Sequence, residues 1–197
     1  MNIDVNLLIA WGAVAKRYAK NEFIFHEGDI ARFYHQVHNG KVKMCWFNDD
    51  GRVFTQGIFG QGESFGEPPL FVNLPYPSCA MAENDCVVYK LSQDTLFRLM
   101  DEYPELKLKF VKIFAHRIYH KSITNKSLVS HNPEEKIITF LDLYKTEKRL
   151  ENKKVLIPFT RQQLADFIGL RVETVIRSLI KMNTNNKVEI RKHKLYY

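Results

Sequence analysis

The sequence is poor in cysteine and has no long apolar run. Its three cysteines, Cys45, Cys79 and Cys86, are scattered and form no CxxC pair. We therefore expect buried thiols rather than a zinc site or an iron–sulfur cluster. No run of about 18 apolar residues occurs, so no transmembrane helix is expected. Residues 1–4 lack the basic-then-apolar pattern of a signal peptide, which makes the cytoplasm the expected location.

Enzymatic signatures are also missing from the sequence. It contains no Ser-His-Asp, paired-carboxylate or phosphate-loop pattern. A metal-dependent barrel enzyme would need His and Glu ligands on one face of its strands. His35 and His38 are three residues apart, so they would point to opposite faces of a strand. We therefore predict that the chain is not an enzyme and has no metal site.

Positive charge, in contrast, is abundant and unevenly distributed. The formal net charge is +7, but residues 1–102 carry more acidic than basic side chains and residues 103–197 the reverse. A basic surface favours an anionic partner without identifying it. This asymmetry suggests a sensing or regulatory part joined to a part that binds nucleic acid.

Residues 160–177 are typical of two short helices joined by a tight turn. Thr160, with Gln163 three residues later, forms a capping-box pattern at the start of the first helix. Gly169 can adopt the positive φ that ends this helix. The apolar residues of the first helix share one face: Leu164, Ala165 and Ile168.

The second helix of this pair would be apolar on one side and polar and basic on the other. Its expected apolar positions are Val172, Val175, Ile176 and Leu179. Its expected outer positions are Arg171, Glu173, Thr174, Arg177 and Lys181. Glu173 and Arg177 are four residues apart and point the same way. Such a helix pair fits the major groove of DNA; an ordinary amphipathic helix hairpin is the alternative.

Residues 22–90 are typical of antiparallel β structure. Short apolar-alternating runs are separated by turns rich in Gly, Asn and Asp, such as residues 38–40, 48–51 and 60–62. Strands at this spacing indicate a barrel or sandwich, and we expect a β-roll of about eight strands. Residues 1 to about 16 precede it as an expected short helix.

Helical patterns follow the β region. Residues 94–100 predict a short helix, and a long helix of about 26 residues, roughly 39 Å, is expected from Pro104 to Ser130. Two copies of this long helix could pair along an apolar seam, so we interpret it as a dimerisation helix. The alternative is a helix that only packs on its own barrel. The apolar positions of the long helix are Leu106, Leu108, Phe110, Val111, Ile113, Phe114, Ile118, Ile123 and Leu128.

The remaining C-terminal segments complete a winged helix-turn-helix. Asn132-Pro133 starts a helix that runs to about Lys148. A short strand at 155–158 precedes the helix pair, and residues 188–197 form a two-stranded wing. We therefore expect an α+β fold with a sensor β-roll over 1–102, a dimerisation helix over 103–131 and a DNA-binding domain over 132–197.

This order of elements resembles the CRP/FNR family of bacterial transcription regulators. The resemblance extends over essentially the whole chain. The motifs that carry it are Glu27-Gly28-Asp29, residues 39–42, residues 57–67, residues 160–162 and Glu173 through Arg177. The resemblance implies a homodimeric, sequence-specific DNA-binding regulator with a cyclic-nucleotide-binding-like roll. A ligand-binding module without DNA contact is the competing class.

The resemblance also implies which residues contact DNA. Family members place a recognition helix at 171–183 and read bases with a Glu and an Arg at the positions of Glu173 and Arg177. Val172-Glu173-Thr174 is similar to the FNR branch, whose half-site resembles TTGAT, but Ile176 departs from the usual Ser or Gly. Phosphate contacts are expected from Arg161, Gln162 and Lys181. The full expected set is Arg161, Gln162, Arg171, Glu173, Thr174, Ile176, Arg177 and Lys181.

The effector site is where the sequence departs most from the family. The Phe65-Gly66-Glu67 turn is present, but Pro77-Ser78 stands where cyclic-nucleotide binders have Arg-Ser. A proline lacks the charge that would hold a cyclic phosphate, so we do not expect cAMP to bind. The candidate pocket comprises Phe65, Gly66, Glu67, Ser78, His120 and Lys121.

Other sensors of the family remain as alternatives. An FNR-type iron–sulfur cluster needs N-terminal cysteines, and none precedes Cys45. Haem would need His or Cys ligands, for which the candidates are His26, His35, His38, His116 and His120. A third possibility is that the roll binds no ligand. The expected partners are double-stranded DNA, a second copy of the chain and, for an activator, RNA polymerase; no membrane contact is expected.

Overall fold

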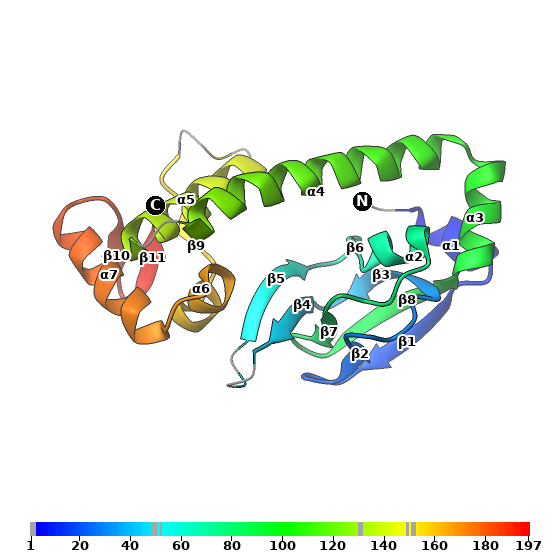
Figure 1. The fold of residues 1–197 in the computed structure, drawn as a ribbon, viewed down its shortest axis with the longest axis horizontal. Coiled ribbons are helices and arrows are strands. Elements are labelled where there is room, and N and C mark those ends of the chain that lie inside the picture. The colour runs from blue at the N-terminus through cyan, green and yellow to red at the C-terminus, as the bar shows by residue number, and fades with distance from the viewer. Residues whose placement is uncertain (1–2, 49–50, 52, 130–131, 149, 151–152) are drawn as a thin grey trace. The chain divides into compact units, whose positions relative to one another are not determined.

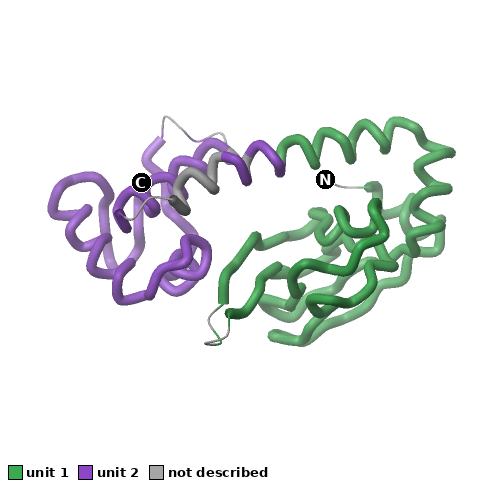
Figure 2. Tube along the Cα trace, viewed as in Figure 1, with its two compact units in different colours: residues 1–116 green, residues 117–197 purple. Residues whose placement is uncertain are grey.

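The computed structural model describes residues 3–48, 51, 53–129, 132–148, 150 and 153–197, without the side chains of residues 120, 123–129 and 147. The chain forms two compact units, residues 1–116 and 117–197 (Figure 2). The division falls within one long helix, and each unit has its own hydrophobic core.

The first unit is an antiparallel β-roll with one helix before it, one between β6 and β7 and two after it (Figure 1). One sheet has the strand order β1-β8-β3-β6 and the other β2-β7-β4-β5. The predicted α+β class with an antiparallel β-roll is thus confirmed. The strands are β1 (Val14–Tyr18), β2 (Phe23–Phe25), β3 (Phe33–Asn39), β4 (Val42–Phe47), β5 (Val53–Phe59), β6 (Ser64–Phe65), β7 (Cys79–Ala82) and β8 (Cys86–Ser92).

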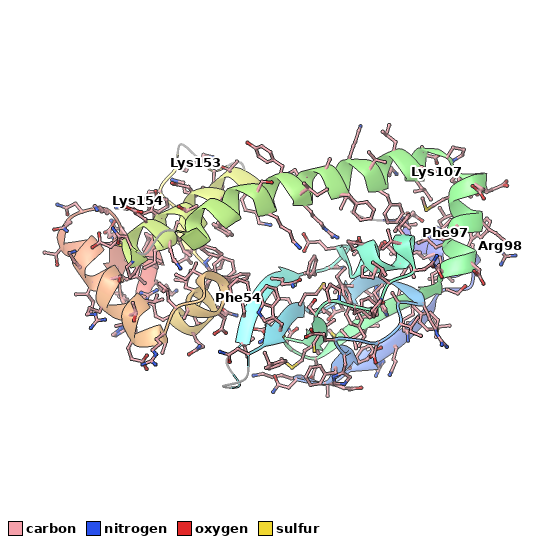
Figure 3. The ribbon with its side chains drawn as sticks, viewed as in Figure 1. Phe54, Phe97, Arg98, Lys107, Lys153 and Lys154 are labelled. Atoms are coloured by element: carbon pink, nitrogen blue, oxygen red, sulfur yellow. The ribbon has the colours of Figure 1, made fainter. Side chains whose placement is uncertain are left out.

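Four helices accompany these strands. They are α1 (Val5–Ala10), α2 (Glu67–Val72), α3 (Gln93–Glu102) and α4 (Glu105–Val129). The predicted N-terminal helix was too long, because α1 ends at Ala10 and β1 begins at Val14. Gly12 lies between them with a φ of 82°, a conformation that ends a helix at little cost in glycine. Side chains from both sheets fill the roll (Figure 3).

The second unit is a helical domain with a small sheet. Its elements are α5 (Pro133–Glu147), β9 (Leu156–Ile157), α6 (Arg161–Ile168), α7 (Val172–Thr184), β10 (Glu189–Arg191) and β11 (Lys194–Tyr196). The wing sheet has the order β10-β11-β9. Lys192 and His193 both have positive φ, 47° and 63°, as the predicted tight turn requires. Among the described residues, no helix is long and apolar enough to cross a membrane.

Candidate nucleic-acid interface

The helix pair begins with a complete capping box. The Thr160 hydroxyl oxygen accepts a hydrogen bond from the Gln163 backbone N–H at 3.1 Å. The Gln163 side-chain oxygen accepts in return from the Thr160 N–H at 2.9 Å. Both bonds satisfy donors that the first turn of a helix leaves open, so they fix where α6 starts.

The turn between the two helices depends on Gly169. Its φ of 66° ends α6, and its N–H donates to the Ala165 carbonyl. The chain then enters α7 at Val172. The buried residues of both helices meet in one core with α5 and the wing: Ile137, Leu141, Ile157, Leu164, Ala165, Ile168, Val175, Leu179, Met182, Val188 and Leu195.

The opposite face of α7 is open to solvent. Arg171, Glu173 and Arg177 are exposed. The Glu173 and Arg177 side chains make no ion pair or hydrogen bond within the described part of the chain. Ile176, expected among the apolar packing positions, is instead 42% exposed and shares this open face, whereas Thr174 is half-buried. This face presents an acidic, a basic and an apolar side chain within one helical turn.

The side chains expected to contact DNA phosphates already bond to other residues of the second unit. Lys181 pairs with Glu134 of α5 at 2.7 Å, and Lys187 reaches the same carboxylate at 3.2 Å. These two ammonium groups hold the pKa of Glu134 below its usual range. The Gln162 side-chain amide donates to Asp166 at 2.8 Å. Lys181 would thus have to exchange a carboxylate for a phosphate to contact DNA.

Arg161 connects the helix pair to the wing. Its guanidinium donates to the His193 carbonyl at the wing turn, at 3.5 Å. Burial lowers the pKa of Arg161 from its ordinary value. At the other end of the wing, the Asn183 side chain of α7 accepts from the Ile190 N–H at 2.8 Å. Both contacts fix the wing beside the helix pair.

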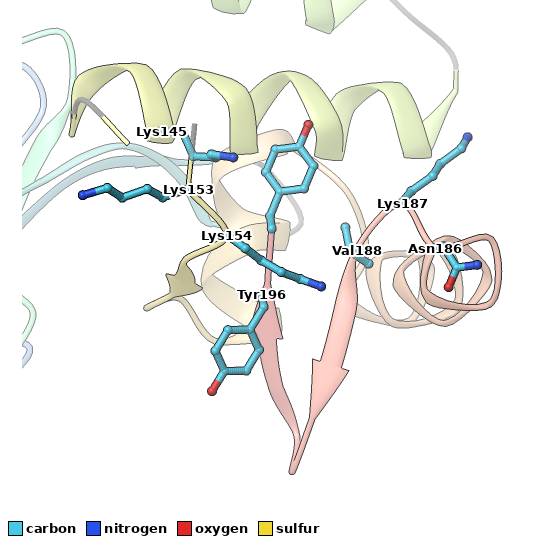
Figure 4. Close-up of a pocket in the computed structure, with 8 residues that line it drawn as sticks. Lys145, Lys153, Lys154, Asn186, Lys187, Val188 and Tyr196 are labelled. Carbon is cyan, nitrogen blue, oxygen red and sulfur yellow. The ribbon is translucent and has the colours of Figure 1, made fainter. Parts of the chain in front are cut away.

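A lysine-rich pocket lies at the base of the wing (Figure 4). It is a shallow, open hollow of about 370 Å³ lined by Lys145, Lys153, Lys154, Asn186, Lys187, Val188, Tyr196 and Tyr197. Lys154 pairs with Glu189. The Tyr197 hydroxyl donates to Asp142 at 2.6 Å, and burial, followed by this bond, raises its pKa to about 12. No local pattern in the sequence predicts this pocket, because its lysines come from three separate segments that only the fold brings together.

Four of the predicted effector residues lie in the β-roll. Phe65, Glu67 and Ser78 are fully buried, and Gly66, with a φ of 72°, immediately precedes α2. The Ser78 hydroxyl donates to the Gln56 side chain at 3.4 Å. Lys121 is exposed and belongs to the second unit, and the side chain of His120 lies outside the described residues. The roll thus contains the turn of the candidate pocket, and Pro77 directly precedes Ser78 in the sequence.

Of the histidine candidates, His35 is packed in the core, whereas His26, His38 and His116 are exposed. His35 is buried against the rings of Phe25 and Phe65, at 5.5 and 5.3 Å. Burial, and secondarily Lys90, lowers its pKa to about 3. The three cysteines are buried and form no disulfide, as expected. Within the described residues, no group of three or more His, Cys, Asp or Glu side chains could hold a metal ion.

Comparisons with known proteins agree with both halves of this architecture. Residues 15–103 match the cyclic nucleotide-binding domain, and residues 135–196 match the Crp-like helix-turn-helix domain. The chain is 23% identical over 181 residues to the fumarate and nitrate reduction regulatory protein of Yersinia pestis, covering 89% of this chain and 71% of that protein. It is 25% identical over 177 residues to the nitrogen fixation regulation protein FixK of Azorhizobium caulinodans, covering 88% and 70%.

A solved structure supports the fold. The c-di-GMP-responsive regulator CLP of Xanthomonas campestris superposes with a TM-score of 0.77 at 21% identity, over 98% of each chain. The relatives matched along most of the chain are transcription regulators rather than enzymes. With a cyclic-nucleotide-binding-type roll followed by a Crp-like DNA-binding domain, the chain belongs to the CRP/FNR family of transcription regulators.

Proposed function

We propose that this regulator binds a two-fold symmetric DNA site as a homodimer and reads bases with the exposed face of α7. The observation that carries this is the pair Glu173 and Arg177, which lie exposed on one helix face with no partner among the described residues. Charged side chains of a recognition helix that have no partner within the protein can form hydrogen bonds with base edges in the major groove.

Each side chain on this face has a chemically suitable base contact. Arg177 can donate two hydrogen bonds to guanine O6 and N7, and Glu173 can accept one from the cytosine amino group. Ile176 can contact a thymine methyl group but cannot hydrogen-bond. Thr174 can donate to or accept from either strand. The similarity of Val172-Glu173-Thr174 to the FNR branch implies a half-site similar to TTGA.

Contacts to the DNA backbone are assigned to other side chains of the second unit. Arg161 and Gln162 begin α6, and Arg171 and Lys181 flank the reading face of α7. Such contacts position a protein without specifying sequence. The lysines around the pocket at the base of the wing add positive charge to the same unit and favour the approach of DNA.

Dimerisation is assigned to α4, which has two apolar faces. Leu106 and Phe110 are buried in the first unit's core. Leu108, Val111 and Ile118 are exposed by 56%, 61% and 65%. With Ala115 they follow the 3-4-3 spacing of a helical seam, which a second copy of α4 can cover. The two recognition helices of such a dimer would read half-sites about one turn of DNA apart.

We assign the roll, residues 1–102, a regulatory role that does not use a cyclic nucleotide, because Pro77 replaces the arginine that would hold the phosphate. Residues 103–131 join the two copies, and residues 132–197 bind DNA in the bacterial cytoplasm. If the protein activates transcription, RNA polymerase is a further partner.

The test is an unbiased selection with the purified full chain and random duplex DNA, without added ligand. Sequencing of the retained DNA is expected to reveal a palindrome with two TTGA-like half-sites. Enrichment of a single, unpaired half-site would contradict the proposal that the protein binds DNA as a homodimer. Absence of any enrichment would overturn ligand-independent, sequence-specific binding.

A further inference from the structure

Aromatic side chains fill the roll beside the Phe65-Gly66-Glu67 turn. The rings of Phe25 and Tyr76 stack almost in parallel, with centroids 3.6 Å apart and planes 7° apart. His35 and Phe65 form a second stack at 5.3 Å and 21°. Tyr76 is only 3% exposed. Stacked rings of the protein itself therefore occupy the space beside this turn.

These rings also cover the turn itself. A methyl group added at Gly66 would lie 2.9 Å from the Phe25 ring and 3.2 Å from the Tyr76 ring. The two rings therefore fill the space on the side of Gly66 from which a side chain would project. The next residues offer no substitute for the missing arginine, since Pro77 has neither charge nor N–H and Ser78 bonds to Gln56. The residues present do not fit a cyclic nucleotide.

Packing contacts connect the Phe65-Gly66-Glu67 turn to α4. Gly66 is followed directly by α2, whose Phe71 side chain packs against α4. The Phe71 ring lies 5.1 Å from that of Phe110 and 5.3 Å from that of Phe114. It also contacts Phe97 of α3 at 5.5 Å. One short helix therefore touches the aromatic stack at its start and the long helix near its end.

We propose that the Phe25–Tyr76 stack is a built-in substitute for an effector, and that Tyr76 is the positioning residue that holds α2 against α4 in the DNA-binding conformation without a ligand. This inference rests on the proposed function. It assigns the roll a structural role in keeping the regulator active. Removing the Tyr76 ring should make DNA binding depend on a small aromatic molecule that refills the space.

The experiment measures the affinity of the full chain for its selected palindrome by fluorescence anisotropy. Tyr76→Ala is expected to lose about tenfold or more in affinity, the size of a typical coupling between two sites. Addition of p-cresol, which has the shape of the tyrosine side chain, is expected to restore binding. Tyr76→Phe keeps the stack and should bind like wild type. Tyr18→Ala removes an equally buried tyrosine of the roll and should show no specific rescue by p-cresol.

A second variant and a ligand test complete the design. Tyr76→Leu keeps apolar volume but loses the stack, and circular dichroism reports whether each variant folds. Wild-type affinity in folded Tyr76→Leu or Tyr76→Ala would overturn the inference. So would a rise in wild-type affinity on addition of cAMP or cGMP. If wild type itself selects no palindrome, the proposed function fails instead, so the two failures are distinguishable.

Discussion

Arg177 lies exposed on α7, four residues after Glu173, and is the side chain whose removal should change base reading most. Arg177→Ala is expected to lose about 1–3 kcal/mol of binding free energy on the selected site and to relax preference at one base pair. Its loss on random DNA should be small. Anisotropy titrations on both duplexes measure the difference.

Arg98→Ala provides the matched control for this change. Arg98 is an exposed arginine of α3 in the first unit (Figure 3), so its removal alters net charge equally. It should leave both affinities nearly unchanged. Equal losses for Arg177→Ala on selected and random DNA would show that Arg177 contacts only the backbone.

Folding lowers the pKa of His35 from an ordinary 6.5 to about 3. We therefore expect the stability of the protein to depend on pH. Above pH 6.5 the imidazole of His35 is neutral in both the folded and the unfolded chain, so its titration does not lower the free energy of unfolding. Between pH 6.5 and 3 the unfolded chain takes up a proton that the folded chain excludes. Stability is therefore lost as pH falls, by up to about 1.4 kcal/mol per pH unit.

Urea unfolding between pH 4 and 8 tests this effect. His35→Phe, which keeps an aromatic ring in the stack, should flatten the slope below pH 6.5. His26→Gln changes an exposed histidine and should leave it as in wild type. An unchanged slope in His35→Phe would mean that other groups cause the loss of stability.

Single residues also show where sequence reasoning ends. Gln36 is fully buried although it is polar. Its burial is possible because its side chain bonds to the N–H and the carbonyl of Ile3, at 3.0 and 2.9 Å. Tyr76 is buried because it stacks on Phe25, 51 positions earlier. Neither role has a local signal. The capping pair Thr160 and Gln163, in contrast, was predictable because both bonds close within four residues.

Among the elements, α6 has its N-terminus fixed by the Thr160 side chain. Thr160→Ala is expected to destabilise the protein by about 1 kcal/mol, since it leaves the Gln163 N–H without its acceptor. The change should appear in urea unfolding. Thr184→Ala removes a threonine at the end of α7, where the hydroxyl donates to the Ile180 carbonyl, and should cost less. Equal costs would argue against a special capping role.

The exposed stripe of α4 gives a second prediction for an element. The double change Leu108→Glu and Val111→Glu puts two charges into the proposed helix seam and should produce a monomer with greatly weakened DNA binding. Sedimentation velocity measures the assembly state. Lys109→Glu, on another side of the helix, should remain dimeric. A dimer that persists in the double variant would place the interface elsewhere.

The elements differ in how far the sequence predicted them. The helix pair α6–α7 and the wing turn were predicted closely, because caps, glycine and turn residues are local signals. β1 and β7 were not, because each is defined by pairing with distant strands. β1 pairs with β8 while four of its five residues are exposed, and β7 is buried throughout. Neither shows the alternation that reveals a strand.

Across the whole chain, acidic side chains outnumber basic ones in residues 1–102 and basic ones outnumber acidic ones in residues 103–197. The first unit contains a closed core with an aromatic stack at the family's ligand turn. The second contains the exposed reading face and the lysine-rich pocket. The long helix α4 belongs to both units.

Dimeric, sequence-specific binding is tested by a titration of ligand-free protein against three duplexes: the selected palindrome, the same duplex with one half-site scrambled, and random DNA. We predict two chains bound per palindrome. The palindrome should bind about a thousandfold more tightly than random DNA, and the half-site duplex should be intermediate. Equal affinity for all three, or one chain per palindrome, would contradict a dimeric, sequence-reading regulator that needs no effector.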